Sequence, residues 1–85
     1  MTAYVYMVEC SDGSLYTGWS WHWERRIDRH NKGQGSKYVR SRLPVKLAYL
    51  ELLDGKSKAL QREAEIKKMS RQQKLKMVEE FRRTE

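Results

Sequence analysis

The sequence has few of the residues that a secreted, disulfide-bonded or membrane-spanning protein would need. Cys10 is the single cysteine among 85 residues, so no disulfide can form within the chain and a reducing compartment is expected. No run of about 18 apolar residues could cross a membrane. No basic residues precede an apolar run at the start, as they would in a signal peptide. These absences predict a cytoplasmic protein that makes no membrane contact.

Basic residues are also absent from the first part of the chain. Residues 1–24 contain no lysine or arginine, whereas residues 25–50 contain eight of them and one acid, Asp28. The net charge of the second segment is +7, the same as that of the whole chain. Because arginine is well suited to phosphate recognition, this segment favours binding to a polyanion such as nucleic acid over a merely solvated surface.

The remaining composition is that of a folded protein. Hydrophobic residues make up 39% of the chain and charged residues 34%, which is too apolar for a disordered segment. The length allows one domain, so residues 1–85 are expected to form a single domain.

The order of the elements predicts an α+β fold. Alternating β-branched and aromatic residues indicate strands, whereas wider apolar spacing with capping residues indicates helices. The expected elements are strands 3–9 and 15–20, helices 21–32 and 36–43, strand 45–53, and helices 57–69 and 70–81. We expect a small three-stranded antiparallel or mixed β-sheet flanked by helices, in the order β-β-α-(α)-β-α-α.

Several boundaries have a specific signal. Gly33 and Gly35 follow the first helix as cap and loop residues, and Pro44 ends the second helix. Ser57 is the expected N-cap of the third helix, and Ser70 with Gln73 forms a capping box. Two faces are also expected: Val45, Leu47 and Tyr49 alternate in the last strand, and Leu75, Val78 and Phe81 share a face of the last helix.

The turn between the first two strands decides how their tyrosines are arranged. With a two-residue loop, Tyr6 lies opposite Trp19 and Tyr16 points to the other face. With a three-residue loop that ends in a left-handed Gly13, Tyr6 lies opposite Gly18 and both tyrosines share a face. In the second case, Gly18 would leave open space beside the phenol for a ligand.

Two positions on helices could carry chemistry. Arg26 and His30 are four residues apart and share a helix face, which suits a phosphate and an attacking water, although spacing alone favours a solvated face. Glu63 lies on a stripe with Leu60 and Ile66, where a carboxylate needs an ion pair or a metal. The lack of a Cys/His cluster excludes a structural zinc site, whereas a lone carboxylate suits Mg²⁺.

The tryptophans and the cysteine are assigned to packing. Trp19, Trp21 and Trp23 alternate, and core or rim packing is favoured over stacking on unpaired bases. Cys10, at the end of a strand, is expected to be a small packed hydrophobe.

Together these pieces resemble the small single-domain bacterial members of the GIY-YIG nuclease superfamily, which are related to the catalytic domain of structure-specific endonucleases. Tyr4-Val5-Tyr6 stands where the family has GIY, and Tyr16-Thr17-Gly18 where it has YIG. The Arg26–His30 pair and the segment ending in Glu63 resemble the family's remaining motifs, and the likeness extends over residues 3–79.

The resemblance implies metal-dependent hydrolysis of DNA phosphodiester bonds, with Mg²⁺ or Mn²⁺ as the cofactor and a structure-specific role in repair or recombination. It implies that Glu63 holds the metal, Arg26 binds the scissile phosphate, Tyr6 or Tyr16 acts on the attacking water, and His30 supports them. It also implies a protein partner that supplies specificity. The residues expected to position the nucleic acid are Arg25, Arg29, Lys32, Lys37, Tyr38, Arg40 and Arg42.

Two other functions are compatible with the sequence. A binding module on the same fold would bind DNA in a salt-sensitive way without cutting it. An adaptor would instead bury its tryptophans against a partner protein and would not retain DNA.

Overall fold

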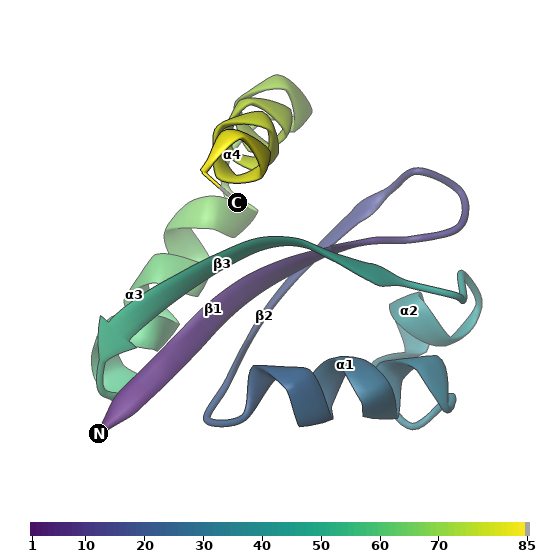
Figure 1. Ribbon diagram of the computed structural model, residues 1–85, viewed down its shortest axis with the longest axis horizontal. Coiled ribbons are helices and arrows are strands. Elements are labelled where there is room, and N and C mark those ends of the chain that lie inside the picture. The colour runs from purple at the N-terminus through teal and green to yellow at the C-terminus, as the bar shows by residue number, and fades with distance from the viewer. Residues whose placement is uncertain (85) are drawn as a thin grey trace.

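The computed structural model describes residues 1–84 and contains one antiparallel sheet (Figure 1). The strands are β1 (Thr2–Glu9), β2 (Leu15–Ser20) and β3 (Lys46–Asp54). Their order in the sheet is β2-β1-β3, and β1 pairs antiparallel with both neighbours. The strand predictions are confirmed, and no pairing within the described sheet is parallel.

Four helices cover the two faces of this sheet. They are α1 (Trp23–Asn31), α2 (Lys37–Arg40), α3 (Lys56–Lys67) and α4 (Arg71–Arg83). Figure 1 shows α1 and α2 on one side of the strands and α3 and α4 on the other. The predicted α+β class and element order are therefore confirmed. Among residues 1–84, no helix is both long and apolar enough to pass through a membrane.

The central strand β1 supplies residues to a core on each face, because successive side chains point to opposite sides of a strand. Val5 and Met7 join the core beneath α3 and α4, whereas Tyr6 and Val8 join the core beneath α1 and α2. Cys10 belongs to the second core and is buried, as predicted. The two sides of the sheet thus have separate cores that share one strand.

The turn after β1 settles the arrangement of the tyrosines. Tyr6 pairs with Gly18 and Val8 with Tyr16, and Gly13 has a φ of 84°. This is the register of the three-residue loop. Because its alternation places Tyr6 and Tyr16 on the same face, the two tyrosines can contribute to one site.

A bulge in β3 alters the predicted alternation of that strand. Met7 pairs with Tyr49 and Val8 with Leu47, so Ala48 is an extra residue on the β3 side. Leu47 therefore packs in the core beneath α1 while Tyr49 packs in the one beneath α3. The prediction that Leu47 and Tyr49 share a face was wrong, because the bulge interrupts the two-residue period.

Three predicted helix boundaries also differ from the structure. The first helix begins at Trp23 rather than residue 21, after the non-helical His22. The second is confined to residues 37–40, because Ser41 already serves as its C-cap. Gly55, with a φ of 98°, is the N-cap of α3, so Ser57 was wrongly assigned that role and lies in the first helical turn.

The last helix follows its predicted cap but not its predicted face. Ser70 and Gln73 form both hydrogen bonds of the capping box, as predicted. Val78 is buried and Phe81 is half-buried, whereas Leu75 is 42% exposed. Met77 packs against the core instead, so the assignment of Leu75 to the apolar face was wrong.

Candidate active site

A buried hydrogen bond joins the sheet to the end of α1. The Tyr6 Oη and His30 Nε2 atoms are 2.9 Å apart, and each residue is only 1% exposed. Tyr6 comes from the middle of β1 and His30 from the last turn of α1. This bond links the central strand to the end of α1 inside the core.

Two glycines allow these side chains to lie where they do. A Cβ atom at Gly18 would lie 2.6 Å from Tyr6 Oη, and one at Gly35 would lie 1.9 Å from His30 Nδ1. The space expected beside Gly18 is therefore filled by the Tyr6 phenol itself, so the prediction of open room for a ligand there was wrong. The contact of Gly35 with His30 was missed, because a glycine after a helix also has an ordinary loop role.

Aromatic rings extend from His30 to the surface. Tyr16 meets the His30 ring edge-on at 5.6 Å between centroids, and it stacks on Tyr38 at 6.1 Å. The Arg42 guanidinium carbon lies 3.8 Å from the centre of the Tyr38 ring. Tyr16 is half-buried and Tyr38 is exposed, so this row of side chains connects the buried pair with solvent.

A hollow of about 300 Å³ opens beside Tyr16 and His30. Arg26 and Arg29 line it from α1, and Gly35 lines it from the following loop. Arg26 is exposed whereas His30 is buried, so the two residues of the predicted pair lie at the surface and at the base of one site. The hollow thus combines an exposed guanidinium with the buried imidazole of the Tyr6–His30 pair.

Burial controls the protonation of that pair. Loss of solvent raises the pKa of Tyr6, and the nearby Arg26 charge only partly opposes this. Burial lowers the pKa of His30, and Arg26 lowers it further. At neutral pH the phenol is therefore protonated and the imidazole neutral. The positive charge of Arg26 is therefore not enough to make Tyr6 a phenolate at neutral pH.

Glu63 approaches this site from α3. Its side chain is 18% exposed, its nearest cation is the Lys67 Nζ atom at 3.7 Å, and its charge contributes to the raised pKa of Tyr6. The predicted apolar stripe is incomplete, because Ile66 is fully buried whereas Leu60 is 42% exposed. Glu63 therefore lies at the edge of the buried surface rather than within it.

The donor set suits a hard cation with few protein ligands. Residues 1–84 contain no group of three His, Cys, Asp or Glu side chains that could hold a metal together. Mg²⁺ and similar ions are often bound by one or two carboxylates, with water and substrate phosphate as the other ligands. The partly exposed Glu63 carboxylate fits this kind of coordination.

Arg62, the residue before Glu63, anchors α3 to the sheet. Arg62 Nε lies 2.9 Å from Glu51 Oε1, and the Tyr49 hydroxyl donates a hydrogen bond to the same oxygen. Because Arg62 precedes Glu63, this contact also fixes the rotation of α3 near the candidate metal ligand. Tyr49 therefore has a structural position on the face away from Tyr6.

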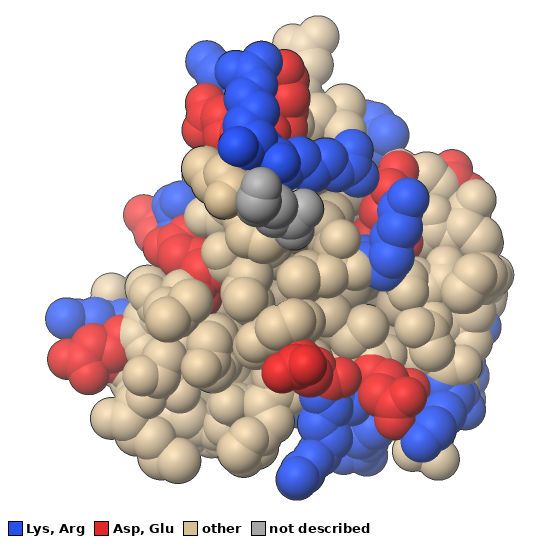
Figure 2. Space-filling view, in the orientation of Figure 1, with Lys and Arg blue, Asp and Glu red and all other residues tan. Residues whose placement is uncertain are grey.

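The basic residues expected to contact nucleic acid differ in their surroundings. Lys32 pairs with Asp28 at 2.8 Å, and Arg42 pairs with Asp12 at 3.1 Å while also donating to the Tyr38 carbonyl oxygen at 2.8 Å. Arg42 thus joins the hairpin turn to α2 and holds Tyr38 in place. The other basic residues of this set are exposed to solvent: Arg25, Arg29, Lys37 and Arg40. Figure 2 shows lysine and arginine side chains gathered over α1, with acidic side chains beside them.

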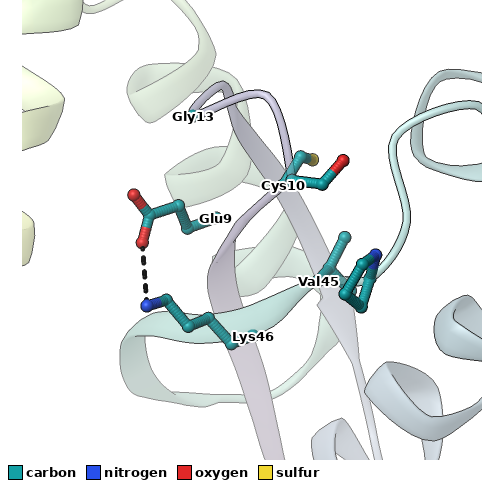
Figure 3. A pocket seen from close by; sticks show the side chains of 7 residues that line it. Glu9, Cys10, Gly13, Val45 and Lys46 are labelled. Atoms are coloured by element: carbon teal, nitrogen blue, oxygen red, sulfur yellow. Dashed lines mark ion pairs between the residues drawn. The ribbon is translucent and has the colours of Figure 1, made fainter.

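A separate hollow of about 440 Å³ lies at the hairpin end of the sheet (Figure 3). Cys10 and Val45 line it, and the Lys46–Glu9 ion pair, 3.5 Å between nitrogen and oxygen, crosses its rim. The residues of the Tyr6–His30 site do not line it. Its walls combine one ion pair with small apolar groups and offer no set of reactive side chains.

The three-stranded antiparallel sheet with helices on both faces defines a small α+β domain. The family model of the GIY-YIG catalytic domain matches residues 2–76. The chain therefore belongs to the GIY-YIG family, which is of the nuclease type. Nucleases of this family bind nucleic acid and generally use a divalent metal.

Relatives of similar length share more than half of their residues with this chain. A UPF0213 protein of Staphylococcus saprophyticus is 57% identical over 77 residues, covering 91% of this chain and 94% of the relative. A UPF0213 protein of Syntrophus aciditrophicus is 54% identical over 78 residues, covering 91% and 90%. Their names record no activity.

Solved structures share the fold. The solution NMR structure of the UPF0213 protein BH0048 from Bacillus halodurans has a TM-score of 0.60 at 42% identity, covering 93% of this chain and 84% of that one. The solution NMR structure of the protein EF2693 from E. faecalis has a TM-score of 0.64 at 37% identity, covering 96% and 88%.

Proposed function

We propose that this protein is a divalent-metal-dependent endonuclease that hydrolyses DNA phosphodiester bonds. The observation that carries the proposal is the buried Tyr6–His30 hydrogen bond beneath an arginine-lined hollow. Membership of a nuclease-type family supports the same reaction. The surface over α1 supplies the positive charge that a DNA backbone needs.

Arg26 is the residue proposed to bind the scissile phosphate. Its guanidinium is exposed at the rim of the hollow, and its positive charge would stabilise the negative charge that develops on the phosphate oxygens. Glu63 would hold Mg²⁺ or Mn²⁺, which when bound stabilises the charge on the leaving oxygen. Glu63 is the one carboxylate to which we assign a metal-binding role.

The Tyr6–His30 pair is proposed to take up the proton of the attacking water. As the water attacks phosphorus and the bond from phosphorus to the leaving oxygen breaks, one water proton passes to Tyr6 Oη while the Tyr6 proton passes to His30 Nε2. The imidazolium then returns a proton through Tyr6 to the leaving oxygen or to solvent, which restores the pair. The first transfer does not require Tyr6 to be ionised before the reaction, which its raised pKa would disfavour. The acceptor is the neutral imidazole of His30, the form that burial favours. Tyr16, which lines the hollow and contacts His30, would orient the water.

A non-cleaving nucleic-acid-binding module is the second candidate. The arginine-lined hollow is compatible with it, since guanidinium groups bind a phosphate backbone without any metal. The adaptor is less well supported. Trp19 and Trp21 are half-buried against the protein's own core, so only part of each ring could be buried against a partner protein.

The test compares wild type, Glu63→Gln and Glu65→Gln on duplex, single-stranded and branched DNA with Mg²⁺ or Mn²⁺. Glu65 is the matched control, because it lies two residues along the same helix with a side chain 64% exposed. We expect metal-dependent products from wild type and Glu65→Gln but none from Glu63→Gln. Equal cleavage by all three proteins would contradict the metal assignment. Binding without cleavage by any of them would favour the non-cleaving module.

A further inference from the structure

The geometry points to a second subsite, next to the proposed cleavage site, that binds one unpaired nucleotide of the DNA. It is a hollow of about 220 Å³ beside the start of α1. This inference rests on the proposed function and specifies its substrate as DNA with unpaired bases beside the cut. The lining residues are Trp19, Ser20, Trp21, His22, Arg25, Arg26 and Arg29.

The aromatic part of this subsite is held rigidly. Trp19 and Trp21 meet edge to face, with 5.5 Å between ring centroids and 82° between planes. Both rings are half-buried and pack against the core beneath α3, while other parts of them line the hollow. The packing predicted for these tryptophans is thus confirmed, and it leaves ring surface available to a base. A fixed aromatic surface can stack on any base, whatever its sequence.

The charged part of the subsite has no carboxylate partner among the described residues. Among residues 1–84, no ion pair involves Arg25, Arg26 or Arg29. No carboxylate lines this hollow, whereas Glu24 lines the neighbouring hollow around Trp23. Three guanidinium groups without a carboxylate partner, beside two indole rings, match a nucleotide, which combines an anionic phosphate with an aromatic base.

The subsite is continuous with the proposed cleavage site. Arg26 and Arg29 line both this hollow and the one above His30. Neighbouring phosphates of one strand could therefore be held by these two arginines while a base reaches Trp21. A base in an intact duplex is stacked on its neighbours, so a flap, an overhang or a bulge is the substrate that fills both hollows.

The test uses the Glu63→Gln protein, so that binding is measured without cleavage. Three DNAs are compared by titration: a blunt duplex, the duplex with a short single-stranded overhang, and the same overhang made of abasic residues. The two overhangs carry equal charge, so their difference reports the bases. We expect roughly tenfold tighter binding of the base-bearing overhang, together with quenching of tryptophan fluorescence that the abasic overhang lacks.

Two conservative variants locate the contact. Trp21→Phe keeps an aromatic ring in the core and should lose most of the quenching and part of the affinity difference. Trp23→Phe, the matched control on α1, should retain both. Circular dichroism of each variant checks that it is folded.

The outcomes separate this inference from the proposed function. Equal, salt-sensitive binding of both overhangs would overturn the subsite while leaving nucleic-acid binding intact. Loss of quenching in Trp23→Phe instead of Trp21→Phe would also overturn it. Failure to bind any of the three DNAs would overturn both proposals.

Discussion

The two faces of the sheet are stabilised in different ways. Beneath α3 and α4 the core is made of apolar groups such as Val5, Met7 and Ile66. Beneath α1 and α2 the same strand buries Tyr6 against His30. Apolar burial is non-directional, whereas a buried polar pair is favourable only while its hydrogen bond is made. The first face should therefore determine stability and the second should determine chemistry.

The largest effect expected from this difference is that of Tyr6→Phe on cleavage. Loss of the hydroxyl removes the proposed proton acceptor, so the cleavage rate should fall about 10²–10⁴-fold. The free energy of unfolding should fall by only about 1–3 kcal/mol, the cost of a buried His30 nitrogen without a partner. Cleavage kinetics and urea unfolding measure the two effects.

The matched control is Tyr4→Phe, since Tyr4 lies two residues away on the same face of β1 and is only half-buried. It should keep the wild-type rate. A Tyr6→Phe protein with the wild-type rate would remove Tyr6 from the mechanism.

For Ile66→Ala, on the other face of the sheet, we expect a large loss of stability without a loss of DNA binding. Ile66 is fully buried, so the free energy of unfolding should fall by about 2–5 kcal/mol. DNA affinity should be unchanged at temperatures where the variant is folded. Leu60→Ala, on the same helix but 42% exposed, is the control and should cost much less. Similar losses of stability in the two variants would show that α3 does not pack as described.

A smaller effect is expected where the backbone of β2 meets Tyr6. The added methyl of Gly18→Ala would lie 2.6 Å from Tyr6 Oη, so the phenol must move, at a cost of about 1–3 kcal/mol of stability. In a double-mutant cycle, Tyr6→Phe should remove part of this cost, because the closest contact is with the hydroxyl. Additive losses would mean that the glycine and the phenol do not interact.

The smallest effect expected is a pH dependence of stability due to His30. Because its pKa is below the ordinary 6.5 in the folded protein, the unfolded chain binds more protons as the pH falls past about 6.5. The free energy of unfolding should therefore decrease from pH 7 towards pH 5. Asp12, whose pKa is lowered from 3.8 by its hydrogen bonds to Ser14, loses its contribution only at more acidic pH.

Urea unfolding of wild type and His30→Gln across this pH range measures the effect. His22 is present in both proteins, so it does not contribute to the difference. The wild-type curve should have the steeper slope. Parallel curves would argue against a buried neutral His30.

The features that were predictable from the sequence depend on local patterns. The shared face of Tyr6 and Tyr16 followed from one of two turn lengths, and Gly13 made the three-residue turn possible. The capping box of Ser70 likewise depends on two residues three apart. Such signals lie within a few residues, so no tertiary information is needed to find them.

The features that were missed depend on contacts between distant segments. The bulge at Ala48 is a property of how β3 pairs with β1, and the contact of Gly35 with His30 depends on the path of the loop. In the sequence, Arg42 resembles the other basic residues. In the structure it forms an ion pair with Asp12, thirty residues away, and its guanidinium lies against the Tyr38 ring. A list of charges cannot distinguish such a residue from one that is available to DNA.

The central position of β1 has a consequence for how the protein is made. Most of the proposed site comes from residues 6–38, yet one edge of β1 is paired only with β3, residues 46–54. Pairing between segments this far apart in sequence has a loop-closure cost, which slows folding. A growing chain would therefore expose Tyr6, Arg26 and His30 before the strand that completes their sheet has emerged from the ribosome. We expect the proposed site to form only after β3 has emerged.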